Sequence, residues 1–254
     1  MSFPAGHRPD PYADRSGYRT RHQARDLCYF RVSVGETDLH IGARRELSGP
    51  ALTAVAEARA QVQAMIAQRP RFASALEPLP PLGGETPLIR DMLQAGQAAG
   101  VGPMAAVAGA IAQYVGRALL PLSPELIVEN GGDIFLAGQR ARVVAVEAGS
   151  GPLSHKLGVR LLPGPGLAVC TSSGTVGHSL SLGKSDAALV VAAEAALADA
   201  AATKLGNLVQ TADDIRPALD RILKIPQIRG ALVVIGDKIG AQGQIELTAL
   251  NETG

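Results

Sequence analysis

Hydrophobic and polar residues alternate along two stretches near the beginning of the chain. Residues 27–34 (LCYFRVSV) and 37–43 (TDLHIGA) follow this two-residue period, which is typical of half-buried β-strands. Only two residues separate them, so we expect a hairpin with a tight turn. The acidic residues beside this turn, Glu36 and Asp38, are interpreted as turn residues, and His40 as a strand residue.

A helical period follows the hairpin. Apolar residues recur at three- and four-residue spacing between Pro50 and Pro70, which predicts a helix that stops at the second proline. Thr86 followed by Pro87 is typical of a helix N-terminus and predicts a second helix. Pro103 opens a third helix, whose alanines and glycine would let another backbone or a ligand lie against it.

Short apolar stretches continue to the end of the chain. They predict strands at residues 125–130, 133–138, 141–149, 156–162, 166–173, 187–194, 230–237 and 244–250, and helices at 195–206 and 213–224. Gly206 and Asn207 are expected to cap the first of these helices. The order of strands, helices and strands occurs twice, and short loops between strands favour antiparallel pairing. We therefore predict an α+β fold of duplicated strand–helix–strand units, with mostly antiparallel sheets and helices on one face.

The first 26 residues differ in composition from the rest. They carry three prolines and five arginines, which predicts a poorly ordered arm that either binds phosphates or is a solvated tail. Residues 27–254 are expected to form a single domain of two similar halves, about 27–150 and 151–254.

Composition narrows the class of protein. Apolar residues make up 46% and charged residues 19% of the 254 positions, as in soluble globular proteins. The formal net charge is +1 and tryptophan is absent, which argues against nucleic acid as a partner. No apolar stretch has the length of a membrane span. Cys28 and Cys170 lack a metal-ligand spacing and are interpreted as reduced thiols of a cytoplasmic protein.

A glycine pair interrupts two predicted strands at residues 128–136 (VENGGDIFL). Asn-Gly between apolar stretches is a strong hairpin signal. The backbone amides of Gly131 and Gly132, between Asn130 and Asp133, are also able to receive an anion or a planar ring. We predict that this turn is both a hairpin and the wall of a ligand site.

A second polar stretch follows a predicted strand at residues 170–187. Its hydroxyls and glycines, including Ser172, Ser173, Gly174 and Thr175, are able to form a cradle for a phosphate or a ring edge. A Ser–His nucleophile pair with His178 is conceivable, although the nucleophile-elbow motif is absent. The alternative is a polar loop whose hydroxyls bond to their own backbone.

Asp199 and Thr203 are four residues apart on a predicted helix of alanines. At this spacing their side chains lie on the same helix face. A carboxylate and a hydroxyl are oxygen ligands that suit a hard cation such as Mg²⁺. Such pairs are also common in helices without any function.

Four segments in this order resemble a known family: GPMAAVAGA, VENGGDIF, TSSGTVGHS and ADAAATKLGN. The sequence is similar to the uncharacterised ApbE-like family, distant relatives of the FAD:protein FMN transferases that were once linked to thiamine biosynthesis. The similarity spans roughly residues 25–247. It implies a fold of two T-fold units and, by analogy with T-fold proteins, a homo-oligomer.

The resemblance also implies a role for particular residues. Asn130, Gly131, Gly132 and Asp133 resemble the segment that lies beside the flavin nucleotide, and Asp199 with Thr203 resembles the Mg²⁺-binding pair. The segment containing Ser172, Ser173, Gly174 and His178 resembles one that lies over the active site. The cofactors implied are Mg²⁺ and FAD or FMN.

The sequence departs from the transferases at two charged positions. Gly102 and Ala108 stand where the transferases carry an aspartate and a lysine that contact the flavin. Two functions follow from this comparison. One is a Mg²⁺-dependent flavin or nucleotide transferase in which His178 is the general base. The other is a non-catalytic ligand-binding or accessory protein, in sulfur assimilation according to the resemblance.

Overall fold

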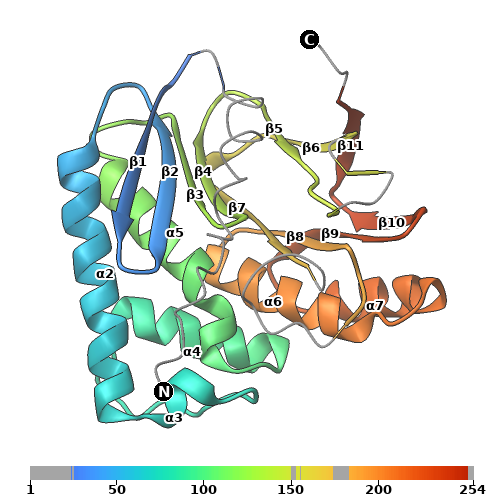
Figure 1. Cartoon of the computed structure of the whole chain (residues 1–254), viewed down its shortest axis with the longest axis horizontal. Helices are drawn as coiled ribbons and strands as arrows, with labels where there is room; N and C mark the ends of the chain where they lie inside the picture. Colours follow the sequence, from blue (N-terminus) through green and yellow to red (C-terminus); the bar gives the residue numbers. More distant parts are fainter. Residues whose placement is uncertain (1–23, 25, 150–152, 155, 174–182, 251–254) are drawn as a thin grey trace, which may run out of the picture.

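The strands form one large and one small antiparallel sheet (Figure 1). A computed structural model describes residues 24, 26–149, 153–154, 156–173 and 183–250. In spatial order the large sheet contains β1 (Cys28–Val34), β2 (Thr37–Ala43), β3 (Leu126–Asn130), β4 (Asp133–Gly138), β7 (Gly164–Ser172), β8 (Ala187–Ala192), β9 (Ile228–Ile235) and β10 (Lys238–Gly243). The small sheet contains β11 (Glu246–Ala249), β6 (Leu157–Leu161) and β5 (Arg142–Ala145).

The helices gather on one face of the large sheet (Figure 1). They are α2 (Ser48–Gln68), α3 (Arg71–Ser74), α4 (Pro87–Ala99), the 3₁₀ turn η1 (Pro103–Ala106), α5 (Val107–Leu119), α6 (Ala195–Leu208), the 3₁₀ turn η2 (Ala212–Asp214) and α7 (Ile215–Ile222). A hairpin, a group of helices and a second hairpin thus follow one another twice, as β1–β4 with α2 to α5 and as β7–β10 with α6 and α7. The predicted α+β class, with mostly antiparallel sheets and this one-sided helix layer, is confirmed.

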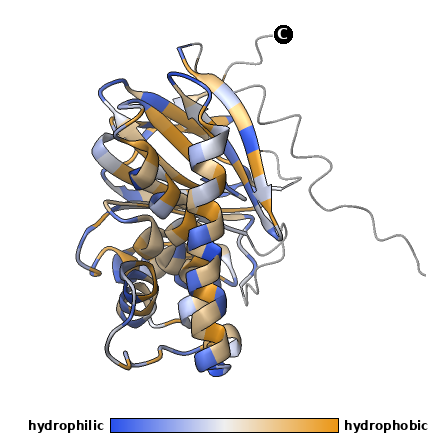
Figure 2. Ribbon diagram, turned by 90° about the vertical axis from the view of Figure 1, so that its left-hand side faces the viewer, coloured by the Kyte–Doolittle hydropathy of each residue, from blue (hydrophilic) through white to orange (hydrophobic). Residues whose placement is uncertain are grey.

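The two faces of the large sheet contribute to different cores. In β7, Cys170 faces α6 and α7, whereas its neighbour Val169 packs with Val159 of the small sheet. This alternation follows from the two-residue period of a strand. In the other half, Leu39 and Phe135 belong to the core beneath α2, α4 and α5. Figure 2 shows that hydrophobic residues predominate in the strands inside the molecule.

Most predicted elements are present in the structure, with several differences. The short helix α3 was not predicted, and the strand predicted at 141–149 ends at Ala145. The stretch that Pro103 opens begins with a 3₁₀ turn before α5. Gly206 and Asn207 do not cap α6, because the helix continues to Leu208 and Val209 is its C-cap. Strand β10 was not predicted. Its sequence, KIGAQG, has two glycines and two polar residues and so carries little apolar signal, and its backbone pairing with β9 defines it.

α4 has the termini that the sequence predicts. Thr86 is its N-cap in an extended conformation, Pro87 is the first helical residue, and Gly100 ends the helix with φ 70°. Among the described residues no single helix is long and apolar enough to cross a membrane. α4 and the segment Pro103–Leu119 pass that test of length and composition only as a pair, bent by 107°.

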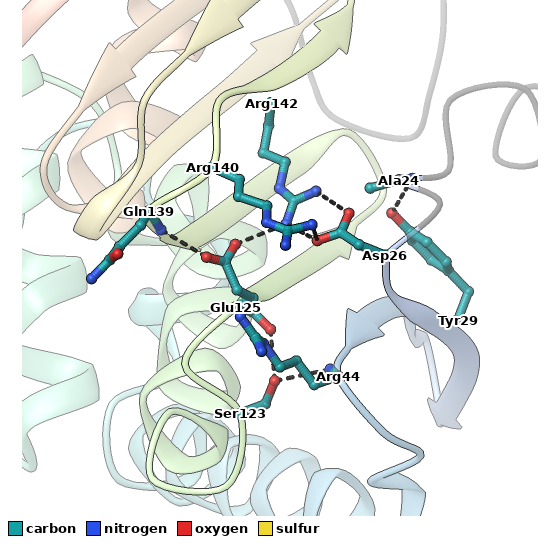
Figure 3. A network of polar contacts seen from close by, with 9 residues as sticks. All are labelled: Ala24, Asp26, Tyr29, Arg44, Ser123, Glu125, Gln139, Arg140 and Arg142. Carbon is teal, nitrogen blue, oxygen red and sulfur yellow. Dashed lines mark hydrogen bonds and ion pairs between the residues drawn. The ribbon is translucent and has the colours of Figure 1, made fainter.

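A charged network holds β5 against the segment that precedes β1 (Figure 3). Arg142 donates two hydrogen bonds to Asp26, at 2.7 and 3.0 Å, and one of 2.8 Å to Glu125. Glu125 also accepts the Gln139 N–H at 2.9 Å. Burial alone would raise the pKa of Glu125, but the hydrogen bonds from Gln139 and Arg142 outweigh it and lower the pKa. The guanidinium of Arg142 is therefore the counter-ion of two carboxylates.

Candidate ligand-binding site

The turn between β3 and β4 has the geometry that paired glycines allow. Asn130 and Asp133 are opposite each other in the strand pairing, with Gly131 at φ 67° and Gly132 at φ 110° between them. Positive φ at both central residues is the requirement of a type I′ hairpin turn. The Asn130 side chain donates a 3.0 Å hydrogen bond to the Ala108 carbonyl, so the turn is fixed to the beginning of α5.

This turn forms part of the wall of a cavity of about 550 Å³. A volume of this size is typical of small-molecule sites. The other walls come from the β1–β2 turn, α2, the η1–α5 junction, the end of β7 and α6. The lining residues are Glu36, Thr37, Asp38, Arg59, Val62, Gln63, Ile66, Met104, Val107, Ala108, Ile111, Asn130, Gly131, Asp133, Thr171, Ser172, Ser173, Asp199 and Thr203.

Three segments that are distant in sequence therefore meet as predicted. Seven predicted site residues line this cavity, namely Asn130, Gly131, Asp133, Ser172, Ser173, Asp199 and Thr203. Gly132 completes the turn, and a Cβ on it would lie 3.8 Å from the Thr171 carbonyl oxygen. Gly174, Thr175 and His178 lie outside the described residues. Their predicted roles stay predictions.

Asp199 is placed by a close crossing of two helices. Its Oδ2 accepts a 2.9 Å hydrogen bond from the backbone N–H of Gly109, in the first turn of α5. A Cβ on Gly109 would lie 2.4 Å from the Ala195 carbonyl oxygen and 2.9 Å from the Asp199 Cβ. Only glycine therefore allows α6 to lie this close, and the positive end of α5 then points at the carboxylate.

Two carboxyl groups, those of Asp133 and Asp199, lie close together at one end of the cavity. The pKa of Asp199 is raised well above its ordinary value, first by loss of water and then by the Asp133 carboxylate, although backbone N–H groups of Gly109 and Ala108 oppose this. Burial also raises the pKa of the Cys170 thiol, as do the charges of Asp133 and Asp199. Each of these groups disfavours ionisation of the others.

This donor set fits a hard divalent cation. Two carboxylates and the Thr203 hydroxyl offer the oxygen ligands that Mg²⁺ prefers, and a cation would relieve the repulsion between Asp133 and Asp199. Within the described part of the chain no three His, Cys, Asp or Glu side chains are grouped closely enough to hold a metal. A cation here would therefore keep several positions for water or ligand oxygens.

Ser172 contributes a buried hydroxyl to the cavity wall. The residue is 8% exposed and lines the cavity, and its Oγ has no hydrogen-bond partner among the described residues. A buried hydroxyl without a partner is unfavourable by about 1–3 kcal/mol. A ligand with a hydrogen-bonding group at this position would satisfy it.

Residues of the first hairpin and α2 were missed as site residues. Glu36 and Asp38 were interpreted only as turn residues, and Arg59 and Gln63 only as helix residues, yet all four line the cavity. A signal existed in the spacing, because Arg59 and Gln63 are four residues apart on α2. The approach of α2 to the hairpin turn depends on tertiary packing.

Gly102, one of the two positions where the sequence differs from the transferases it resembles, lies against the backbone of Ala75. A Cβ at this position would lie 1.7 Å from the Ala75 carbonyl oxygen, so no larger side chain fits here. Ala108, at the second departure, lines the cavity. The backbone of Ala75 therefore occupies the space beside Gly102, whereas Ala108 borders the cavity.

The fold defines a class of protein. It is similar to the flavin transferase ApbE from Vibrio cholerae, with a TM-score of 0.58 and 12% identity over 85% of this chain and 96% of that one. The ApbE protein of Thermotoga maritima gives a TM-score of 0.53, again with 12% identity, over 85% and 96% of the two chains. The molecule thus has an ApbE-like fold.

Sequence comparison places the chain in a particular family among proteins of this fold. The chain belongs to the family described as AbpE bacteria, whose model matches residues 19–241. The UPF0280 protein of Methanothermobacter thermautotrophicus is 41% identical over 222 residues, which is 85% of each chain. That of Methanocella arvoryzae is 39% identical over 217 residues, which is 85% of this chain and 88% of the relative. The predicted membership of an uncharacterised ApbE-like family is confirmed.

Proposed function

We propose that the protein binds a flavin or another nucleotide together with Mg²⁺ in this cavity, and that it acts as a Mg²⁺-dependent transferase. The observation that carries the proposal is the meeting of the Asn130–Asp133 turn, the Ser172–Ser173 segment and the Asp199–Thr203 pair around one space. The flavin transferase activity of the structurally similar Vibrio cholerae protein supports the choice of ligand.

The walls suit the two ends of such a ligand. Val62, Ile66, Val107 and Ile111 provide apolar surface for a planar ring. Asp133, Asp199 and Thr203 would hold Mg²⁺, which when bound neutralises the oxygens of a pyrophosphate and stabilises charge as a bond to phosphorus breaks. The hydroxyl of Ser172 and the amides of the glycine turn would orient the ligand. His178 is the predicted general base.

Binding is tested with FAD, FMN, ADP and ATP, each with and without MgCl₂, by calorimetry and by the shift in melting temperature. We expect Mg²⁺-dependent binding that Asp199→Asn abolishes and that Asp220→Asn, a matched change on the exposed face of α7, leaves intact. Turnover is followed by mass spectrometry of the nucleotide. Failure of every nucleotide to bind in the presence of Mg²⁺ would refute the proposal.

A second candidate function is binding without catalysis, as an accessory protein. The close contact between Gly102 and Ala75 favours it, because the aspartate position of the transferases has no room for a side chain. This candidate predicts Mg²⁺-dependent binding and unchanged nucleotide after long incubation. Turnover that Asp199→Asn removes would exclude it.

A further inference from the structure

We propose that Arg59 binds the phosphate group of the cavity's ligand, and that the carboxylate of Glu36 occupies this phosphate position while no ligand is bound. The inference rests on the proposed function, and it assigns to α2 the part of the site that discriminates phosphorylated from unphosphorylated ligands.

The guanidinium of Arg59 is held in one orientation at the cavity wall. Its NH1 donates a 2.9 Å hydrogen bond to the buried hydroxyl of Thr37, and its NH2 lies 2.5 Å from Glu36 Oε2. A Cβ on Gly35 would lie 2.5 Å from this NH2, so the glycine leaves the space that the guanidinium fills. Arg59 is therefore only 17% exposed although α2 lies at the surface. A planar group fixed in this way is prepared for bidentate contact with a phosphate.

Arg59 belongs to one stripe of α2 that faces the cavity. Val62, Gln63 and Ile66 follow it at the spacing of a helix face, and all of them line the cavity. The charged, amide and apolar members of this stripe match a ligand with a phosphate at one end and a ring at the other.

Acidic residues outnumber basic ones in the described wall of the cavity, so Arg59 is the side chain there that is able to attract a phosphate. Among the described lining residues, Glu36, Asp38, Asp133 and Asp199 are acidic and Arg59 alone is basic. Mg²⁺ held by Asp133 and Asp199 would compensate for negative charge at that end of the cavity, but an additional phosphate would need a cation of its own. Arg59 supplies this positive charge from α2.

The present partner of Arg59 is easily displaced. The Glu36 side chain is 88% exposed, so its ion pair with Arg59 is screened by water and contributes little. The hydrogen bond from Arg59 holds the pKa of Glu36 below its ordinary value, which keeps the carboxylate charged. A carboxylate and a phosphate oxygen are equivalent acceptors for a guanidinium, so an arriving phosphate is able to take the place of Glu36 while Thr37 keeps the arginine oriented.

The test compares phosphorylated and unphosphorylated probes in the presence of MgCl₂. Affinities of FMN and riboflavin, and of AMP and adenosine, are measured for the wild type, Arg59→Gln and Glu36→Gln. We expect Arg59→Gln to weaken FMN or AMP binding roughly 10- to 100-fold, the usual effect of a charge-assisted hydrogen bond, and to leave the unphosphorylated probe within about twofold. Glu36→Gln removes the competing carboxylate and should tighten the phosphorylated probe by roughly two- to fivefold.

Arg160→Gln makes the same change of charge at an exposed ion pair with Glu246, away from the cavity, and should leave every affinity unchanged. Wild-type affinity of Arg59→Gln for FMN and AMP, or weaker binding by Glu36→Gln, would overturn the inference while the proposed function stands. Failure of the wild type to bind any of the four probes would overturn both. The two variants are expected to change the affinity for the phosphorylated probe in opposite directions, which a loss of fold would not do. If Arg59→Gln does not fold, the affinity of Glu36→Gln alone tests the inference.

Discussion

At the scale of single residues, the charged form of Asp199 is unfavourable in the metal-free protein. Its carboxylate is partly buried beside Asp133, and its raised pKa shows that the charged form is disfavoured there. An asparagine would keep an oxygen to accept the Gly109 N–H without carrying charge. We expect Asp199→Asn to abolish Mg²⁺ binding and to raise the melting temperature of the metal-free protein at pH 7 by about 2–4 °C, the effect of roughly 1 kcal/mol in a chain of this size.

Scanning calorimetry with EDTA, beside Mg²⁺ titration of the same preparation, measures both parts of this prediction. Asp220→Asn is the control and should change neither. A lower melting temperature for Asp199→Asn would mean that the carboxylate stabilises the metal-free fold, contrary to the electrostatic argument.

Ser172 gives a second prediction at this scale. Its buried Oγ lacks a partner among the described residues, so Ser172→Ala should leave the free energy of unfolding unchanged or raise it by up to about 1 kcal/mol. Nucleotide affinity should fall, because the ligand loses a hydrogen-bond partner. Urea denaturation and calorimetric titration separate the two effects, and destabilisation by more than about 1 kcal/mol would show that the hydroxyl has an essential structural partner.

At the scale of elements, the site depends on how closely α5 and α6 cross. A methyl group on Gly109 would meet the Ala195 carbonyl oxygen at 2.4 Å, and backbone atoms cannot rotate away as a flexible side chain can. We expect Gly109→Ala to lower the free energy of unfolding by about 1–3 kcal/mol and to weaken Mg²⁺ binding by displacing Asp199.

Gly49→Ala is the matched control in another helix. A Cβ on Gly49 meets nothing within 4 Å, so alanine there should stabilise α2 by up to about 1 kcal/mol through helix propensity. Both variants are compared by urea denaturation. Equal effects of the two substitutions would contradict the role of close helix crossing.

The elements also show how far the sequence predicts the fold and the site. The β1–β2 hairpin and α4 were predictable because period, turn residues and the Thr86–Pro87 pair are local signals. Strand β10 was not, since its pairing with β9 is a property of the folded sheet. The same holds for Arg59. Nothing local indicates that its guanidinium reaches the hairpin turn, whereas the glycine pair of the Asn130–Asp133 turn carries its own geometric requirement.

At the scale of the whole molecule, the Arg142 network connects three parts of the chain that are distant in sequence. Arg142 is 8% exposed, whereas its neighbour Arg140, which also contacts Asp26, is 60% exposed. Arg142→Met leaves Glu125 buried without its counter-ion and should lower the free energy of unfolding by about 3–5 kcal/mol. Arg140→Ala removes an exposed ion pair and should lower it by less than about 1 kcal/mol. Similar losses for both arginines would contradict this ranking.

The same network predicts how stability depends on pH. The hydrogen bond from Arg142 lowers the pKa of Asp26 from 3.8 to about 2. Because the folded-state value lies below the unfolded-state value, the stabilisation from Asp26 is complete above about pH 4 and is lost as the pH falls towards 2. Acid titration followed by circular dichroism should show an unfolding step in this window that is weaker in Asp26→Asn. If Asp26→Asn unfolds in acid as the wild type does, groups other than Asp26 cause the acid unfolding.

The small sheet is completed by β11, the last strand among the described residues. Its strand β6 pairs with β11, and the ion pair between them joins Arg160 to Glu246, 86 positions later. A nascent chain that has emerged as far as residue 243 contains every strand of the large sheet, but it still exposes one edge of β6. Such an edge is a template for pairing with another chain, and it is covered only when β11 pairs with β6.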